Sequence, residues 1–246
     1  EFLYKKSWII TGQTQGIVKN ISSRFPQKKV YWLPNGVDTD VYNCQTGSFQ
    51  LDNDWRIKNG FLKNDILFLY AGIIGHAQGL EVILYAAEKL KQNTFLKFII
   101  VGSGPEKEKL IVLKNERELN NVFFFDTISK NEMPVVLASV NACIIPLRRL
   151  DLFKGAIPSK IFEALAMQKP ILLGVEGEAK ELFIDQGRCG LAFIPEDAED
   201  LVLQISRLVK DNSLCMQLGN SGLNYVREHF TRDKIADEFW LILKEA

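Results

Sequence analysis

One pattern constrains the fold of this chain more than any other. Short apolar runs, rich in β-branched and aromatic residues, alternate with stretches whose apolar residues recur at helical spacing. The apolar runs cover residues 8–11, 30–33, 66–71, 96–101, 122–125, 142–146, 170–174 and 191–194. The helical patterns cover residues 80–90, 106–116, 132–138 and 160–167, and three more follow at 198–210, 213–229 and 234–244. This order predicts an α/β fold with a doubly wound parallel sheet that is covered by helices on both faces.

A turn near the start of the chain predicts a domain boundary. Pro34-Asn35-Gly36-Val37-Asp38 is a turn sequence, and residues 43–54 are polar and loop-like. We therefore expect residues 1–35 to be the tail of a preceding domain and residues 36–246 to form one α/β domain. The chain begins at Glu1, without an initiator methionine, and approaches a strand at once through Trp8, so we interpret it as a fragment.

The composition excludes several classes of protein. Of the 246 residues, 47% are hydrophobic, which is ample for a sizeable core, and 30 basic side chains balance 30 acidic ones, which disfavours a nucleic-acid partner. No apolar run reaches the roughly 18 residues that span a bilayer, so we expect a soluble domain. The four cysteines are not closely paired in sequence, and they predict free thiols in a reducing, cytoplasmic setting: Cys44, Cys143, Cys189 and Cys215. The chain has only two histidines, His76 and His229, which argues against a metal centre.

Residues 142–174 carry the clearest sign of a ligand site. A strand runs into a loop with Arg148 and Arg149, and a helix then starts near Pro158. We predict that Pro158 occupies the first helical position, where the free N–H groups that follow can face a phosphate. The guanidinium of Arg148 is suited to the same anion, although arginines in a solvated loop are an equally ordinary explanation.

Lys160 and Glu163 in that helix predict a nucleotide site. They are three residues apart and share a face, while Phe162, Leu165 and Ala166 form the opposite, core-facing stripe. A cation for a diphosphate and a carboxylate for vicinal sugar hydroxyls, one turn apart, are suited to holding a nucleotide. The alternative for these two residues is a solvated ion pair.

Loops at other strand ends add further candidates. The glycine loop at 72–79, which contains Gly75, His76 and Gln78, can bring backbone close to a phosphate, or can use glycine only to make a tight turn. The turn at 102–106 is interpreted as structural. After the next strand, Ser129 and Glu132 fit a capping box, which leaves the backbone of Thr127 and Ile128 as candidate base contacts.

Three motifs together resemble the C-terminal, nucleotide-sugar-binding domain of retaining GT-B glycosyltransferases of the group 1, or family 4, type, especially those of bacterial polysaccharide and O-antigen synthesis. The turn at 34–38 looks like that family's domain-entry motif, and Gly102-Ser103-Gly104-Pro105-Glu106 resembles its G-x-G-P-E turn. Pro158-Ser159-Lys160-Ile161-Phe162-Glu163, with Lys169-Pro170 after it, looks like its P-S-K-x-x-E and K-P block. The resemblance implies a Rossmann-like sheet that forms the C-terminal half of a GT-B fold.

The same resemblance implies roles for individual residues. Glu163 would accept hydrogen bonds from the nucleotide ribose, and Lys160 with the loop at 72–79 would face the diphosphate and the sugar. Two departures are visible: Gly155 stands where the family has the first of two paired glutamates, and Ile73 and Gln78 stand where many members carry cations. Lys160, Arg148 or Lys154 would then replace the missing charges. The expected donor-binding set is Gly75, His76, Gln78, Thr127, Ile128, Arg148, Lys154, Gly155, Lys160 and Glu163.

The leading hypothesis is the donor-binding half of a glycosyltransferase that moves a sugar from a nucleotide diphosphate, with UDP favoured, to a saccharide or lipid-linked saccharide acceptor. No cofactor or metal is expected, and the fragment alone is expected to be inactive because the N-terminal acceptor domain is missing. We expect a cytoplasmic protein, with peripheral contact to the inner face of the membrane as an option through that missing domain. A nucleotide-sugar epimerase domain and a non-catalytic nucleotide-binding domain remain as alternatives.

Overall fold

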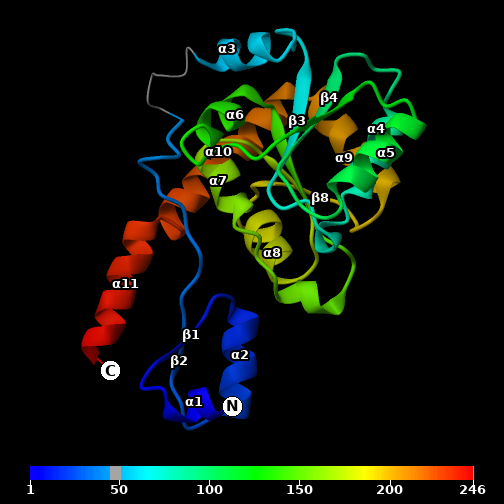
Figure 1. Cartoon of the computed structure of the whole chain (residues 1–246). Helices are drawn as coiled ribbons and strands as arrows, with labels where there is room; N and C mark the ends of the chain where they lie inside the picture. The colour runs from blue at the N-terminus through cyan, green and yellow to red at the C-terminus, as the bar shows by residue number, and fades with distance from the viewer. Residues whose placement is uncertain (45–50, 246) are drawn as a thin grey trace.

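The computed structural model describes residues 1–44 and 51–245, and its main feature is a six-stranded sheet (Figure 1). All neighbouring strands in this sheet are parallel, in the order β5-β4-β3-β6-β7-β8. The strands are β3 (Ile66–Ala71), β4 (Leu96–Val101), β5 (Val122–Phe125), β6 (Ala142–Pro146), β7 (Ile171–Gly174) and β8 (Gly190–Ala192). The prediction of a doubly wound parallel sheet is confirmed. The strand order reverses between β3 and β6, the point at which such sheets bind ligands beyond the carboxyl ends of the strands.

Helices cover both faces of the sheet because successive strand residues point to opposite faces and both sets are apolar. One core cluster joins the sheet to α3 (Leu51–Lys58), α6 (Met133–Ser139), α7 (Lys160–Ala166) and the π-helical segment η3 (Glu181–Gln186). The other joins it to α4 (Glu81–Lys89), α5 (Lys107–Glu116) and α9 (Ala198–Lys210). The long α10 (Asn212–His229) contributes Leu218 to one cluster and Val226 to the other.

The first 33 residues form a separate, smaller unit. It consists of α1 (Phe2–Lys6), β1 (Ile10–Gly12), α2 (Gln15–Arg24) and β2 (Val30–Trp32), and β1 and β2 pair in parallel. Its small core of Ile10, Ile21 and Phe25 is distinct from the two clusters of the large sheet. A contact joins the small unit to the six-stranded domain: the Glu178 carboxylate at the start of α8 (Glu178–Lys180) accepts hydrogen bonds from the backbone N–H groups of Gln15 and Gly16, at 2.6 and 2.9 Å.

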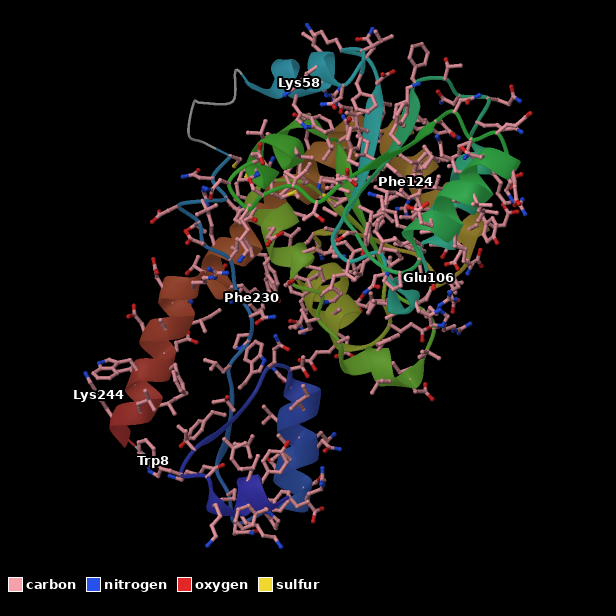
Figure 2. All side chains as sticks on the ribbon, viewed as in Figure 1. Trp8, Lys58, Glu106, Phe124, Phe230 and Lys244 are labelled. Carbon is pink, nitrogen blue, oxygen red and sulfur yellow. The ribbon has the colours of Figure 1, made fainter. Side chains whose placement is uncertain are left out.

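A linker connects the small unit to the six-stranded domain and is pinned where α10 meets α11 (Arg232–Glu245). Val37 donates a backbone hydrogen bond to Phe230 and accepts one from Arg232, each 3.0 Å long. Figure 2 shows Phe230 beside this linker. From there α11 projects away from the domain on the side of the small unit (Figure 1). The two ends of the chain therefore lie on the same side of the large sheet.

Several predicted elements need correction. Residues 2–6 are helical, where the approach to a strand was expected, and α2 and the stretch from α8 through η3 were not predicted. The loop expected at 43–54 is wrong from Leu51 onward, because α3 begins there; residues 45–50 of that stretch lie outside the described residues. Trp55 anchors α3 by packing on Phe125 of β5 at 5.7 Å between ring centroids, a tertiary contact that overrides the polar local sequence.

The structure also shows the state of the cysteines and the length and polarity of the helices. The four cysteines are free, and Cys143 and Cys189 are buried. Within residues 1–44 and 51–245, no helix is both long and apolar enough to cross a membrane.

Candidate functional site

A large cavity lies at the carboxyl ends of β3 and β6, where the strand order reverses. It has a volume of about 950 Å³ and lies between the six-stranded domain and the small N-terminal unit. The small unit contributes Thr14, Ile17 and Ile21 to its wall. A second cavity of about 240 Å³ adjoins it and shares Gly72 and Ile73. Together the lining residues of the two cavities run along the rim of the sheet from the end of β6, past the end of β3, to the end of β4.

Lys160, at the start of α7, lines the larger cavity. Its Nζ lies 3.9 Å from the centroid of the Tyr70 ring, a cation–π contact, and close to Gly72 at the end of β3. Tyr70 is itself fixed, because its ring is fully buried and its hydroxyl donates to the Ile73 carbonyl. Burial of Lys160 lowers the pKa of its ammonium group to about 8. Because the Lys160 ammonium group is largely withdrawn from water, an anion that enters the cavity would stabilise its charged form strongly.

Glu163 lies one turn along α7 and lines the same cavity. Burial raises the pKa of its carboxyl group, and a hydrogen bond from the Tyr42 hydroxyl opposes that rise, as do the nearby cations Lys130, Lys160 and Arg232. The predicted core stripe of Phe162, Leu165 and Ala166 is confirmed, since all three are buried on the other side of the helix. Both polar groups are partly withdrawn from water, so a fully solvated ion pair does not describe them.

Pro158 lies outside the helix, which corrects one prediction. α7 begins at Lys160 with Ser159 as its N-cap, so Pro158 precedes the cap instead of occupying the first helical position. In the first turn of α7, the N–H groups of Ile161 and Phe162 donate to the carbonyl oxygens of Pro158 and Ser159. Pro158 and Ser159 still line the cavity, and Lys160 is its charged group.

The glycine loop after β3 is shaped by the turn after β4. Gly72 has a φ of 141° and Gly102 a φ of 143°, and a Cβ at Gly102 would lie 1.9 Å from the Gly72 carbonyl oxygen. Ile74 donates to the Ser103 carbonyl and accepts from the Glu106 N–H, which holds the two loops together. The turn at 102–106 therefore supports the loop that approaches the ligand space, as its structural interpretation predicted.

Arg148 is held by the protein itself. Its guanidinium donates to the His76 carbonyl at 2.7 Å and forms ion pairs with Glu81 at 3.1 Å and Glu196 at 2.8 Å. It lines neither cavity at the switch point, and Lys154, which pairs with Asp151 at 2.7 Å, lines neither of them as well. Both residues lie instead around a small pocket beside Val175 and Glu176.

The remaining predicted residues fall into two groups. Gln78 and Gly155 line the large cavity, and Thr127 and Ile128 line the adjoining one, so the structure brings these four together with Lys160 and Glu163. Gly75 and His76 belong to the glycine loop but line neither cavity, and the side chain of Gln78 accepts a hydrogen bond from the Gly75 N–H.

The predicted capping box at Ser129 is wrong. The Ser129 hydroxyl donates to the Glu132 carboxylate at 2.6 Å, and α6 begins after Glu132 without a side-chain cap. This pair lies beside Ile128 and leaves the rim residues before it facing the second cavity.

Two site residues escaped the sequence reasoning. Tyr42 belongs to the linker, 121 positions before Glu163. The sequence around Tyr42 gives no sign of a polar contact with Glu163. Tyr70 was assigned only to an apolar strand. The alternation of strand residues indicates that Tyr70 shares the face of Phe68, but not that its ring supports a cation.

Comparison with known proteins identifies the family. A family model described as glycosyl transferases group 1 matches residues 52–225, so the chain belongs to this family. The Escherichia coli protein WcaI, assigned to colanic acid biosynthesis as a glycosyl transferase, is 28% identical over 179 residues, which is 71% of this chain and 43% of the relative. The O-antigen chain mannosyltransferase C of Escherichia coli is 23% identical over 239 residues, which is 97% of this chain and 60% of the relative. The chain thus spans about half the length of these curated relatives.

Solved structures support the same fold. The chain superposes on Anabaena HepE, solved in complex with UDP and glucose, with a TM-score of 0.84 at 16% identity, over 99% of this chain and 65% of HepE. A glycosyltransferase from Rickettsia africae gives a TM-score of 0.82 at 18% identity, over 96% of this chain and 63% of that protein. The fold is therefore that of a GT-B glycosyltransferase domain, as the resemblance implied.

Proposed function

We propose that this chain binds the donor of a glycosyltransferase, a sugar carried on a nucleotide diphosphate, with UDP as the nucleotide. In this proposal residues 36–246 are the donor domain and residues 1–35 are the tail of an acceptor domain. The observation that carries the proposal is the pair of Lys160 and Glu163 on one wall of the cavity at the switch point. HepE, which shares the fold, is solved with UDP and with UDP-glucose, and this favours UDP.

The proposed ligand lies along the rim. The base enters the smaller cavity against Thr127 and Ile128, and the ribose places its vicinal hydroxyls on the Glu163 carboxylate. The diphosphate then meets the Lys160 ammonium and the backbone of the loop that begins at Gly72. The sugar extends into the larger cavity past Gly155. This arrangement provides one charged side chain for the ribose and one of opposite charge for the diphosphate.

The reaction in this proposal depends on positioning and electrostatics. When the bond from the sugar carbon to the diphosphate oxygen breaks, the electron pair stays on the diphosphate, and the charged Lys160 stabilises it. The acceptor oxygen forms the new bond to the sugar carbon from the side of the small N-terminal unit, and the proton of the acceptor hydroxyl passes to the departing diphosphate. A saccharide or lipid-linked saccharide acceptor is proposed, because the relatives' names refer to colanic acid and O-antigen chains. Gly155 supplies no carboxylate here, and no other residue is assigned as a catalyst.

Metal independence belongs to the proposal. Among the described residues, no three His, Cys, Asp or Glu side chains gather in a metal-binding arrangement, and Lys160 supplies the positive charge at the diphosphate. UDP affinity in EDTA and in Mg²⁺ should therefore be equal. A requirement for Mg²⁺ would contradict this part of the proposal.

A nucleotide panel tests the proposed ligand. Thermal unfolding of the 246-residue chain is measured with UDP, UDP-glucose, GDP and uridine. A ligand present at about 100 times its Kd adds roughly 2.7 kcal/mol to the free energy of unfolding, so UDP should give a clear upward shift in Tm. Stabilisation by none of the four ligands would contradict the proposal.

Product analysis of the longer protein separates the two alternatives. Sugar transfer supports the glycosyltransferase. A change in the configuration of the nucleotide sugar indicates an epimerase, and binding without turnover indicates a non-catalytic nucleotide-binding domain.

We further propose a cytoplasmic location, with peripheral membrane contact through the part of the protein that precedes this chain. Co-sedimentation of the longer protein, but not of the 246-residue chain, with anionic lipid vesicles would support that contact.

A further inference from the structure

One buried side chain, that of Tyr70 in β3, reaches both groups that are proposed to meet the diphosphate. The centroid of its ring lies 3.9 Å from the Lys160 Nζ, and its hydroxyl donates a hydrogen bond to the Ile73 carbonyl. Lys160, Gly72 and Ile73 all line the larger cavity. Tyr70 itself is 1% exposed and lines neither of the two cavities, so it stands behind the wall that the ligand would touch.

The end of β3 leaves room for the ammonium group. Gly72 has a φ of 141°, and a Cβ at this position would lie 2.8 Å from the Lys160 Nζ and 3.6 Å from the Tyr70 hydroxyl oxygen. A side chain at Gly72 would therefore push the ammonium group away from the ring. The Tyr70 ring thus holds the cation at a place that glycine keeps open.

The Tyr70 hydroxyl fixes the glycine loop at a second point. Ile74 is already bonded to the turn after β4 through Ser103 and Glu106. The bond from Tyr70 holds the residue before it, Ile73, which lines both cavities. The wall that the two cavities share is therefore fixed to β3 as well as to the neighbouring turn.

Packing alone does not require a tyrosine at this position. The Tyr70 ring belongs to the core cluster that also contains Phe68 and Phe98, and a phenylalanine would fill the same apolar space. Burial raises the pKa of the Tyr70 hydroxyl, so the side chain stays neutral and attracts the cation through the face of its ring. The hydroxyl is then available to donate to the loop.

We propose that Tyr70 is a positioning residue for the diphosphate: its ring holds the Lys160 ammonium group, and its hydroxyl holds the glycine loop at Ile73. This inference rests on the proposed diphosphate contact of Lys160. The face of an aromatic ring attracts the charged ammonium group and not the neutral amine, so it favours the form that a diphosphate needs. The other titratable groups that act on Lys160 are Glu163 on the same helix and Cys143 of β6.

The role of the ring is tested with Tyr70→Leu in the 246-residue chain, with the Kd of UDP measured by calorimetry at pH 7 and pH 9. If the ring favours the charged form of Lys160 about tenfold, as desolvated cation–π contacts can, its loss lowers the pKa of Lys160 further below about 8. Relative to the unmodified chain at the same pH, UDP binding should then weaken about twofold at pH 7 and about tenfold at pH 9.

Phe98→Leu is the matched control for the loss of a ring. Phe98 is also fully buried in the same core cluster, and it lines neither cavity. This variant should leave the Kd of UDP unchanged at both pH values. A fluorinated phenylalanine at position 70 keeps the shape of the ring and weakens its negative face, so it repeats the ring test without a change in packing. Compared with Tyr70→Phe, it should show the same pH-dependent loss.

The role of the hydroxyl is tested with Tyr70→Phe, which keeps the ring. We expect UDP binding to weaken about threefold, equally at pH 7 and pH 9, because the charge on Lys160 is unaffected. Hydrogen–deuterium exchange of peptides that cover residues 72–79 should become faster. Tyr225→Phe is the control, since the Tyr225 hydroxyl contacts Gln186, away from the cavity, and it should change neither measurement.

A double-mutant cycle with Lys160→Ala makes the test decisive. In that background, Tyr70→Leu should weaken UDP binding no more than Tyr70→Phe does. A larger loss there, or a loss in Tyr70→Leu that is equal at pH 7 and pH 9, would overturn the role of the ring. Unchanged UDP binding in Tyr70→Phe would overturn the role of the hydroxyl.

The same variants distinguish this inference from the proposed function. If Lys160→Ala weakens UDP binding and none of the changes at position 70 does, only the role of Tyr70 is refuted. If Lys160→Ala leaves UDP binding intact, the diphosphate contact itself is refuted, and the inference falls with it.

Discussion

The lowered pKa of Lys160 gives a quantitative prediction for nucleotide binding. The diphosphate is expected to bind the charged ammonium form, whose pKa is about 8 in the free protein. About 90% of the molecules carry this charge at pH 7 and about 10% at pH 9. The contribution of Lys160 to UDP affinity should therefore fall about tenfold over this range, or about 1.4 kcal/mol. The sign follows from the cation: raising the pH removes the group that the ligand needs.

The assay compares UDP with uridine by calorimetry at several pH values between 7 and 9. Both ligands carry the same uracil, so ionisation of the base cancels in the ratio of their Kd values. The phosphate, with a pKa of about 6, is already ionised throughout. The Kd of UDP divided by the Kd of uridine should rise about tenfold between pH 7 and pH 9. In Lys160→Ala, the preference for UDP over uridine should be smaller and independent of pH.

Two results would refute this reasoning. A constant ratio between pH 7 and pH 9 would show that the charge on Lys160 does not contribute to diphosphate binding. A pH-dependent ratio that persists in Lys160→Ala would assign the effect to another group. Equal weakening of UDP and uridine by Lys160→Ala would indicate instead that the variant disturbs the start of α7.

Three further predictions concern the ion pairs of Arg148, the glycines around the site and the activity of the 246-residue chain. Arg148→Ala removes ion pairs to Glu81 and Glu196 and should lower the free energy of unfolding by about 1–2 kcal/mol, while weakening UDP and uridine equally; a loss confined to UDP would instead support a phosphate contact. Gly102→Ala should cost about 2 kcal/mol or more, or about 4–8 °C in Tm, because its Cβ would collide with Gly72, whereas Gly155→Ala meets open space and should leave Tm unchanged. Equal Tm values for these two variants would argue against the close approach of the two loops. Finally, the 246-residue chain should bind UDP without transferring sugar to any acceptor, and robust transfer by the purified chain would contradict the proposed domain division.

The sheet was predictable because its strands are buried on both faces. The predicted bounds of β3 to β6 agree with the structure residue for residue, since an apolar run flanked by glycine or polar residues leaves little choice of register. The helices that were missed depend on other signals. The start of α2 is fixed by the Thr14 side chain, which accepts a hydrogen bond from the Ile17 N–H, and α3 depends on the contact between Trp55 and Phe125 of β5.

The site was predictable only in part. Lys160 and Glu163 were found because their spacing on a helix is local information. The partners that fix the role of a side chain are distant in sequence: Glu196 is 48 positions from Arg148, and Glu163 is 121 positions from Tyr42. No local pattern shows that a loop arginine is already paired, or that a linker tyrosine contacts a carboxylate. Such assignments require the tertiary structure.

Hydrogen–deuterium exchange with and without UDP tests the central claim most directly, because it locates the ligand without any substitution. Bound UDP should slow exchange in peptides that cover residues 72–79, 126–130 and 155–166, which surround the two cavities. Peptides from α9, on the opposite face of the sheet, should exchange at the same rate in both conditions. Protection confined to α9 or another remote segment, or no protection at saturating UDP, would contradict a nucleotide site at the switch point between β3 and β6.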